Sequence, residues 1–424
     1  MTEIDMQQVA VDYIRSGKSL MLTGGAGRGK SHVIRGAVTP RTVLCAPFGI
    51  AALNIGGETT TSVFGLPVGG IIEEDWDAAS RNFKELFSDD FVNRIVIDEW
   101  STLRADMADL IDYKLRKIRN VDEPFGGIQV VFVGDGLQLP PVVLDEEKRK
   151  FRTEYKSPYF FSSRVWQEMV AKGLVKAVVL TKSYRQSEGH QVALLDAIRT
   201  KSKHYKMAVK RLNEWCPAKL EGVDPIVLCN YNADADKINK DYFDSIDGQE
   251  LQCVATIKGN FKKESCLVPE ILKLKIGCRV MICANDQDGF YKNGQLGVLT
   301  QADASGTMVL IDGDKQPTLI KMFTWENVKH VKGMGGLVRK IDGEMTQLPL
   351  RIGKALSVHK SQGLSLDHVE VNLGNKCFAP HQAYVAISRV RNLKNMALTR
   401  PIREDDIKID KKVARFYDSL GDIK

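Results

Sequence analysis

A glycine-rich loop limits what this chain can fold into more than any other feature. The pattern GxxxxGK[ST] is matched by Gly24-Gly25-Ala26-Gly27-Arg28-Gly29-Lys30-Ser31. The loop follows an apolar run, Leu20–Thr23, and opens a helical pattern. Its glycines let backbone N–H groups turn toward phosphate oxygens, and the helix dipole adds positive potential there. The sequence therefore predicts a strand, a phosphate-binding loop and a helix, in that order.

Short apolar runs alternate with helical patterns around this loop. The runs predicted to be buried parallel strands are Leu20–Thr23, Thr42–Ala46, Arg94–Asp98 and Gln129–Gly134, and the helices between them include Ser31–Ala37 and Met107–Ile118. This alternation is typical of a doubly wound α/β sheet. A second α/β unit begins near Val178, and the turn-rich stretch from Gly277 to Arg339 predicts a small antiparallel barrel or sheet.

Composition excludes several classes of protein. The 424 residues are 43% hydrophobic and 27% charged, as in an ordinary globular protein, and no apolar run is long enough for a membrane span. A net charge of +7 permits a polyanionic partner without requiring one. The eight cysteines form no CxxC pair, which predicts reduced, buried thiols. Without a signal or transit pattern, the chain is expected to start here and to stay in the cytoplasm of a bacterial or phage-infected cell.

Two adjacent carboxylates, Asp98 and Glu99, lie at the end of the predicted strand Arg94–Asp98 and complete the chemistry of the loop. Lys30 is predicted to neutralise the β- and γ-phosphates of ATP, and Ser31 and Asp98 to hold Mg²⁺. Glu99 would then polarise the attacking water as a general base. At the end of the strand Gln129–Gly134, Gln138 is a polar group that can sense the γ-phosphate by hydrogen bonding.

Seven motifs occur in an order that resembles the superfamily 1 DNA helicases of the 5′→3′ branch. They are GGAGRGKS, CAPFGIAALNIGG, VIDEWS, PFGGIQVVFVGDGLQLPPV, LTKSYRQ, HKSQGLSLD and QAYVAISRVR. The PFGGIQ segment and the helix before it look like the signature of the PIF (petite integration frequency) family. The resemblance implies an α/β fold with two RecA-like P-loop core domains and small β-rich insertions.

The resemblance also implies a division of the chain. Residues 1–180 would form the first RecA-like domain, with a wedge-type insertion at 63–92. Residues 181–285 and 340–424 would form the second, and 286–339 the inserted β-barrel. In such helicases the wedge separates the strands of the duplex, and Phe64 and Leu66 are candidates for its tip.

Further site residues come from the resemblance alone. Gln7 matches the adenine-reading glutamine, and Gly363 is assigned to the nucleotide site with the phosphate loop. Arg185 and Arg389 match two arginines that reach the γ-phosphate, a role that a planar, permanently charged group suits. The predicted DNA contacts are Phe48, Gly49, Thr61, Ser62, Phe64, Asn230, His359, Lys360 and Ser361. Phe48, Thr61 and Arg28 differ from the family's usual residues.

The sequence thus predicts an ATP- and Mg²⁺-dependent 5′→3′ DNA helicase, a monomer acting on single-stranded DNA and fork duplex. Replication, repair or recombination proteins are its expected partners. A single-stranded DNA translocase or a RecD-type recombination motor subunit without autonomous unwinding stays open as an alternative. A nucleotide-switched binding protein and a small-molecule kinase fit fewer motifs, and RNA stays open as the strand.

Overall fold

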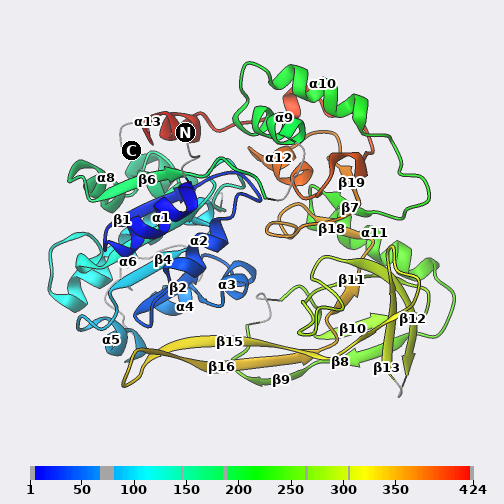
Figure 1. Cartoon of the computed structure of the whole chain (residues 1–424), viewed down its shortest axis with the longest axis horizontal. Coiled ribbons are helices and arrows are strands. Elements are labelled where there is room, and N and C mark those ends of the chain that lie inside the picture. The colour runs from blue at the N-terminus through cyan, green and yellow to red at the C-terminus, as the bar shows by residue number, and fades with distance from the viewer. Residues whose placement is uncertain are drawn as a thin grey trace. The chain divides into compact units, whose positions relative to one another are not determined.

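The computed structural model describes residues 5–66, 81–144, 147–184, 189–262, 266–303 and 306–420 (Figure 1). The chain divides into two compact units. Unit 1 comprises Met1–Ser187, Asn327–Asp342 and Ile409–Lys424, and unit 2 comprises Glu188–Glu326 and Gly343–Lys408. Three segments therefore group differently from the predicted domains, because residues 181–187, Asn327–Asp342 and Ile409–Lys424 all belong to unit 1.

A six-stranded parallel sheet forms the centre of unit 1. Its strand order is β3-β2-β4-β5-β1-β6, and every neighbouring pair is parallel. The strands are β1 (Ser19–Thr23), β2 (Thr42–Ala46), β3 (Glu58–Thr59), β4 (Arg94–Ile97), β5 (Gln129–Gly134) and β6 (Val175–Val179). The four strands predicted from apolar runs are confirmed, and the doubly wound α/β architecture with them.

Both faces of this sheet are covered by helices, which is why its strands read as continuous apolar runs. Leu20 and Leu22 pack with α1 (Met6–Arg15) and α2 (Lys30–Ala37), whereas Met21 between them faces α6 (Ala105–Arg119), α8 (Arg164–Ala171) and α13 (Lys411–Ser419). The other helices of unit 1 are α3 (Gly49–Ile55), α4 (Thr60–Phe64), α5 (Arg81–Phe87) and α7 (Lys148–Glu154). Short 3-10 turns lie at Trp100–Thr102, Pro124–Gly127 and Phe160–Ser162.

Unit 2 is built on a smaller parallel sheet of order β18-β7-β19-β20. Its strands are β7 (Ile226–Cys229), β18 (Ala355–Ser357), β19 (Val369–Asn372) and β20 (Met396–Leu398). The accompanying helices are α9 (Gly189–Thr200), α10 (Tyr205–Trp215), α11 (Asn232–Ser245) and α12 (Gln382–Ile387), with 3-10 turns at Leu393–Asn395 and Glu404–Asp406. The predicted second α/β unit is therefore present.

An antiparallel region interrupts unit 2, as the turn-rich sequence predicts. A five-stranded sheet has the order β14-β13-β12-β11-β17. Its strands are β11 (Arg279–Ile282), β12 (Leu296–Asp303), β13 (Gly306–Ile311), β14 (Thr318–Ile320) and β17 (Leu350–Ile352). Strand β11 lies within the turn-rich stretch but before the predicted barrel limits of 286–339, and β17 lies after them; both contribute to the apolar core of this sheet. A further pair joins β8 (Leu251–Val254) to β10 (Ile271–Leu274).

A long ribbon of β15 (Phe323–Lys332) and β16 (Leu337–Gln347), continued by β9 (Thr256–Gly259), explains the unexpected grouping of Asn327–Asp342. Within unit 1, His330 Nδ1 lies 2.7 Å from Glu58 Oε1, and both side chains are buried. The backbone N–H of Leu337 donates to the carbonyl of Pro40 at 2.6 Å. These contacts join residues far apart in sequence, which no local pattern reveals.

Six of the eight cysteines are buried as predicted, and Cys253 and Cys266 are half-buried. All eight are free, and Cys45, Cys216, Cys229, Cys278, Cys283 and Cys377 are buried. Burial raises the pKa of Cys216 to about 12, which keeps that thiol protonated and unreactive. In the part of the chain that the structure describes, no helix has both the length and the apolar character needed to cross a membrane.

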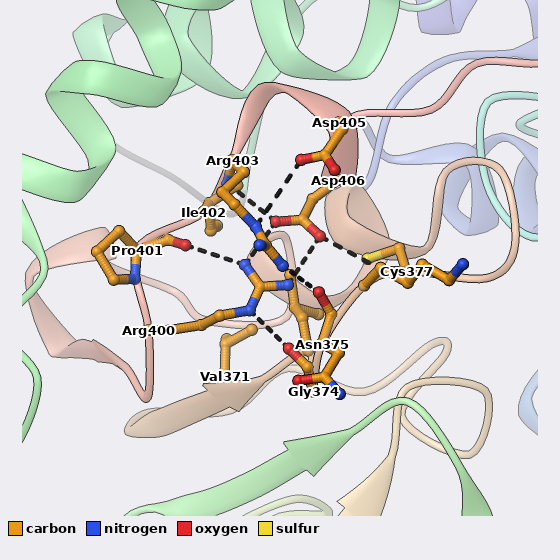
Figure 2. Close-up of polar contacts among 12 residues, drawn as sticks. Val371, Gly374, Asn375, Cys377, Arg400, Pro401, Ile402, Arg403, Asp405 and Asp406 are labelled. Carbon is orange, nitrogen blue, oxygen red and sulfur yellow. Dashed lines mark hydrogen bonds and ion pairs between the residues drawn. The ribbon is translucent and has the colours of Figure 1, made fainter.

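An ion pair between Arg400 and Asp406, both in the segment after β20, lies against the loop after β19 in unit 2 (Figure 2). Both carboxylate oxygens of Asp406 accept from Arg400 guanidinium nitrogens, at 2.6 and 2.8 Å, and the Arg403 N–H donates to Asp406 at 2.9 Å. Arg400 Nε also donates to the Gly374 carbonyl at 2.6 Å. Burial raises the pKa of Asp406, but hydrogen bonds from Arg400 and Arg403 lower it more, so the pKa lies below its ordinary value.

Replacing Asp406 with asparagine is expected to lower the free energy of unfolding by about 3 kcal/mol, because the Arg400 guanidinium loses its paired charge. Since the folded pKa is depressed, the stabilisation is complete above the unfolded pKa of about 4 and is lost as the pH falls through the folded value. Urea denaturation of the wild type and of Asp406→Asn at pH 7 and pH 3 measures the difference in the free energy of unfolding. Asp405→Asn, at an exposed neighbour, is the control, and equal losses in the two variants would contradict the prediction.

Candidate nucleotide and nucleic-acid sites

The phosphate loop has backbone conformations that require glycine. Gly27 and Gly29 have φ values of 71° and 82°, in the left-handed region. A Cβ atom on Gly29 would also lie 2.0 Å from the Nε2 atom of Gln7. Gly29 precedes α2 and has no side chain to cap it, so the first amides of the helix are suited to bind an anion. Glycine therefore occupies the loop positions where the backbone is left-handed, and the binding of phosphate there stays a prediction.

Lys30 points back over this loop. Its Nζ donates to the carbonyl of Gly24 at 2.7 Å and to that of Gly25 at 3.1 Å. The ammonium group is therefore held above the glycines, where the phosphates of a nucleotide would lie. Ser31, the next residue, is exposed at the start of α2.

Asp98 and Glu99 follow β4 as predicted. The Asp98 N–H donates to the Cys45 carbonyl at 2.9 Å, and an Asp98 carboxylate oxygen accepts from the Glu99 N–H at 2.9 Å. Burial, together with the nearby Glu99 charge, raises the pKa of Asp98 to about 7, although the Glu99 N–H and Lys30 lower it. The charged form of a carboxylate in this environment is stabilised by a cation placed beside it.

Glu99 has a left-handed backbone conformation, with φ 52° and ψ 43°. This is uncommon for a residue with a Cβ and costs roughly 1–3 kcal/mol. The conformation is imposed by the 3-10 turn that starts at once, in which the Glu99 carbonyl accepts from the N–H and the hydroxyl of Thr102, both at 3.0 Å. Strain of this kind concentrates at functional sites, which agrees with the predicted role of Glu99.

A cavity of about 120 Å³ lies beside the loop, and its walls include Gln7, Arg28, Leu180 and Tyr184. The Gln7 side-chain amide donates to the Arg28 carbonyl at 3.3 Å, so the predicted adenine-reading residue reaches the loop. The Tyr184 N–H donates to the carbonyl of Gly27 at 2.8 Å. Sequence reasoning did not single out Tyr184, although it lies in the quoted SYRQ motif. Arg185, in the same motif, lies outside the described residues.

Gln138 is buried in the loop that follows β5. Its side-chain amide donates to Asp135 Oδ2 at 3.4 Å, and its backbone N–H donates to the Asp135 carbonyl at 3.0 Å. The Asp135 side chain is itself fully buried. The predicted sensor is therefore oriented by a carboxylate that sequence reasoning did not assign a role.

In unit 2, the segment after β18 carries four predicted residues. His359 is next to the half-exposed Lys360, and burial lowers the pKa of His359. The Ser361 hydroxyl is buried and donates to the Val358 carbonyl at 2.8 Å, so its side chain has a structural role rather than the predicted DNA contact. Gly363 has φ 83°, which explains a glycine there.

Arg389 is almost completely buried inside unit 2. Its Nε donates to the Val385 carbonyl at 2.8 Å, and its Nη2 donates to the Ser388 hydroxyl at 2.8 Å. A guanidinium in this position must exchange these partners before it can reach a phosphate. Its role at the γ-phosphate stays a prediction.

Three aromatic rings form a stack on unit 2. Tyr231 and Phe378 are stacked with centroids 4.8 Å apart and planes at 17°, and His359 stacks on Phe378 at 6.1 Å and 11°. Tyr231 is 51% exposed and Phe378 is 46% exposed, so about half of each residue meets solvent. Of these three residues, sequence reasoning identified only His359, because the other two reach it through the fold.

Two predicted contacts prove to be structural residues. Phe64 is 0% exposed and packs with Phe83 and Phe87, so its ring has no free face for a base, and its assignment to the DNA site was wrong. Leu66 is buried in the same core and is equally unsuited to a wedge tip. The buried Asn230 amide donates to the carbonyls of Leu373 and Lys376, at 2.5 and 3.1 Å, and so holds a loop. Residues 67–80, about half of the predicted wedge at 63–92, lie outside the described residues.

The other predicted first-unit contacts surround the start of α3 and α4. Phe48 is half-buried against Ala46, Ala51 and Ala52, and Gly49 begins α3. Thr61 and Ser62 lie in the first turn of α4, where the Ser62 hydroxyl donates to Glu58 at 3.3 Å. Their contact with DNA stays a prediction.

Comparison with known proteins places this chain in a family. The family model described as PIF1-like helicase matches residues 4–204. The chain is 31% identical to the human ATP-dependent DNA helicase PIF1 over 99% of its own length, and 30% identical to the ATP-dependent DNA helicase Pif1 of Bdellovibrio bacteriovorus over 97%. It covers 64% of the human protein and 90% of the bacterial one.

A solved structure agrees with this result. The crystal structure of Bacteroides sp. Pif1 in complex with ADP-AlF4 is 30% identical, with a TM-score of 0.88, over 100% of this chain and 98% of that one. The predicted RecA-like cores with small β-rich insertions are thereby confirmed. The chain spans less than two thirds of the length of the vertebrate relatives it matches. The phosphate loop, the carboxylate pair and these similarities lead to one conclusion: the chain belongs to the PIF1-like helicase family.

Proposed function

We propose that the chain is an ATP-dependent DNA helicase that moves 5′→3′ along single-stranded DNA and unwinds duplex. The observation that carries the proposal is that Lys30, Asp98, Glu99 and Gln138 lie in the segments that follow β1, β4 and β5, three neighbouring parallel strands of unit 1. The proposal takes the chain to act in the cytoplasm as a monomer on single strands and forks, beside replication or repair proteins.

The donor groups fit Mg²⁺ bound together with ATP. Among the described residues no group of three or more His, Cys, Asp and Glu side chains could hold a metal by itself. Magnesium commonly takes one or two protein oxygens and completes its shell with water and phosphate. The Ser31 hydroxyl and the Asp98 carboxylate are oxygen donors of this kind, and the raised pKa of Asp98 supports a nearby cation. The bound ion would supply charge neutralisation at the β- and γ-phosphates.

Hydrolysis follows from the remaining groups. Lys30 binds the phosphates, Glu99 accepts a proton from the attacking water, and Gln138 hydrogen-bonds at the γ-phosphate. Gln7 reads the adenine edge, since an amide both donates and accepts, and Tyr184 lines the same cavity. We assign Arg185 and Arg389 to the transferring phosphoryl group, where charge spreads in the transition state.

The aromatic stack of Tyr231, His359 and Phe378 supports the binding of a single strand. Exposed rings stack on bases of any sequence, and the neighbouring Lys360 can contact phosphates. Such contacts suit a motor, which must bind and release every nucleotide in turn.

Replacing both Tyr231 and Phe378 with alanine is expected to weaken the binding of single-stranded DNA by about tenfold to a hundredfold, because stacking contributes about 1–3 kcal/mol per base. Fluorescence anisotropy with a labelled oligothymidylate measures the change. Tyr113→Ala removes a similarly exposed ring from α6 in unit 1 and is the control. Equal affinities for the double variant and wild type would exclude the stack from the DNA site.

The decisive test compares unwinding of 5′-tailed and 3′-tailed duplexes while ATP hydrolysis is followed. We expect single-stranded DNA to stimulate hydrolysis strongly, and only the 5′-tailed duplex to be unwound. Hydrolysis that is indifferent to DNA would exclude a helicase. Stimulated hydrolysis without unwinding of either substrate would favour the translocase or RecD-type motor instead.

A further inference from the structure

The hydroxyl group of Tyr417 joins three parts of unit 1. Its oxygen lies 2.6 Å from Thr23 Oγ1, 3.0 Å from Asp135 Oδ1 and 3.1 Å from the backbone nitrogen of Gly136. Tyr417 lies in α13, close to the end of the chain, whereas Thr23 ends β1 and Asp135 follows β5. One side chain thus bridges the ends of two central, adjacent strands.

These three contacts use the full hydrogen-bonding capacity of a phenol. A hydroxyl can donate once and accept twice. Tyr417 donates to the Asp135 carboxylate, and it accepts from the Gly136 N–H. The remaining position accepts from the Thr23 hydroxyl, so that each of the three contacts has a donor and an acceptor. Losing the hydroxyl would leave polar groups of the fully buried Thr23 and Asp135 without this partner.

Both side chains held by Tyr417 are directly connected to the hydrolysis site. Thr23 is followed by Gly24, the first residue of the phosphate loop. Asp135 accepts from the N–H of Leu137 through Oδ1 at 3.1 Å and from the side chain of Gln138 through Oδ2 at 3.4 Å. Tyr417 therefore acts on the orientation of the proposed γ-phosphate sensor through a single intervening carboxylate.

The position of this hydroxyl is fixed by the packing of α13. Phe416 stacks on Phe161 with centroids 4.2 Å apart and planes at 9°, and it meets the edge of Trp100 at 5.9 Å. Val413, one turn earlier, is completely buried. At the helix start, the Tyr159 hydroxyl donates to Asp410 Oδ2 at 3.1 Å. The last helix is therefore held at both ends rather than attached by Tyr417 alone.

We propose that Tyr417 is a positioning residue for ATP hydrolysis, which holds Asp135 and thereby Gln138 in register with the phosphate loop. This role rests on the ATPase activity proposed above. It gives the C-terminal helix a role in hydrolysis that Tyr417 exerts through Thr23 and Asp135.

The test replaces Tyr417 with phenylalanine in the full chain, which keeps the ring and removes only the hydroxyl. We expect the kcat of DNA-stimulated ATP hydrolysis to fall about tenfold, since one charge-assisted hydrogen bond is lost. The KM for ATP should change by less than about twofold, because Lys30 and the loop still bind the phosphates. Combining Tyr417→Phe with Gln138→Ala should slow hydrolysis no further than Gln138→Ala alone, because Tyr417 is proposed to act only through the position of Gln138.

Tyr159→Phe is the matched control. It removes another hydroxyl that donates to a carboxylate near α13, but this hydroxyl donates to Asp410 rather than to Asp135. We expect it to lower the melting temperature while kcat stays within about twofold of wild type. The positioning role is refuted if Tyr417→Phe leaves kcat unchanged, if both variants slow hydrolysis equally, or if the double variant multiplies the two losses. A wild-type chain without ATPase activity would instead refute the proposed function itself, and this role with it.

Discussion

Replacing Lys30 with alanine is expected to reduce DNA-stimulated ATP hydrolysis by about 10³-fold or more, because a preorganised charge at the transferring phosphates disappears. The Lys30 ammonium already lies over the loop, 2.7 Å from the Gly24 carbonyl, so little rearrangement is needed when ATP binds. The affinity for ATP should fall as well, since the same charge acts in the ground state. Steady-state hydrolysis and equilibrium binding of a fluorescent ATP analogue measure the two effects separately.

The lysine control is Lys172→Ala, which removes a side chain that pairs with Glu168 and Glu123 at the surface of unit 1. It should hydrolyse ATP at the wild-type rate. Lys30→Arg is informative too, because a planar fork cannot replace a compact ammonium between two carbonyls, and we expect little recovery. If Lys30→Ala hydrolysed ATP at the wild-type rate and had the wild-type melting temperature, the nucleotide site would not include Lys30.

The local parts of this site could be predicted from the sequence because each depends on a few consecutive residues. The left-handed φ of Gly27 and Gly29 and the helix start at Lys30 follow from one octapeptide. The same holds for β4 and the carboxylates that follow it, since a buried parallel strand is an apolar run that ends at the site edge.

Contacts between distant segments could not be predicted in this way. Tyr417 and Thr23 are separated by 394 positions and meet only because α13 packs on the first sheet. Tyr231 and Phe378 stack because β7 and β19 are neighbours, an order that local patterns do not encode. Phe64 is the reverse case, a contact that was predicted but is not available. A phenylalanine near a motif can be a stacking platform or a core residue, and only its burial distinguishes the two.

Replacing Glu99 with glutamine is expected to slow hydrolysis by about 10³-fold while ATP binding is retained, because an amide cannot accept the proton of the attacking water. The neighbouring charge on Glu99 is one cause of the raised pKa of Asp98. Removing it lowers that pKa, so Asp98 is ionised more fully at neutral pH and should hold a cation at least as well. Single-turnover hydrolysis together with binding of a fluorescent ATP analogue separates the two steps.

The backbone conformation of Glu99 provides an internal control for its proposed role as the general base. With φ at 52°, a residue bearing a Cβ is strained there, and glycine is not. Glu99→Gly should therefore lose hydrolysis as Glu99→Gln does, yet unfold no more easily than wild type and gain up to about 1 kcal/mol of stability. If Glu99 is a catalytic base whose backbone conformation destabilises the fold, its replacement by glycine should lower activity and raise stability. If glycine destabilised the chain and glutamine kept more than about a tenth of the wild-type rate, Glu99 would be a structural residue and the general base would lie elsewhere.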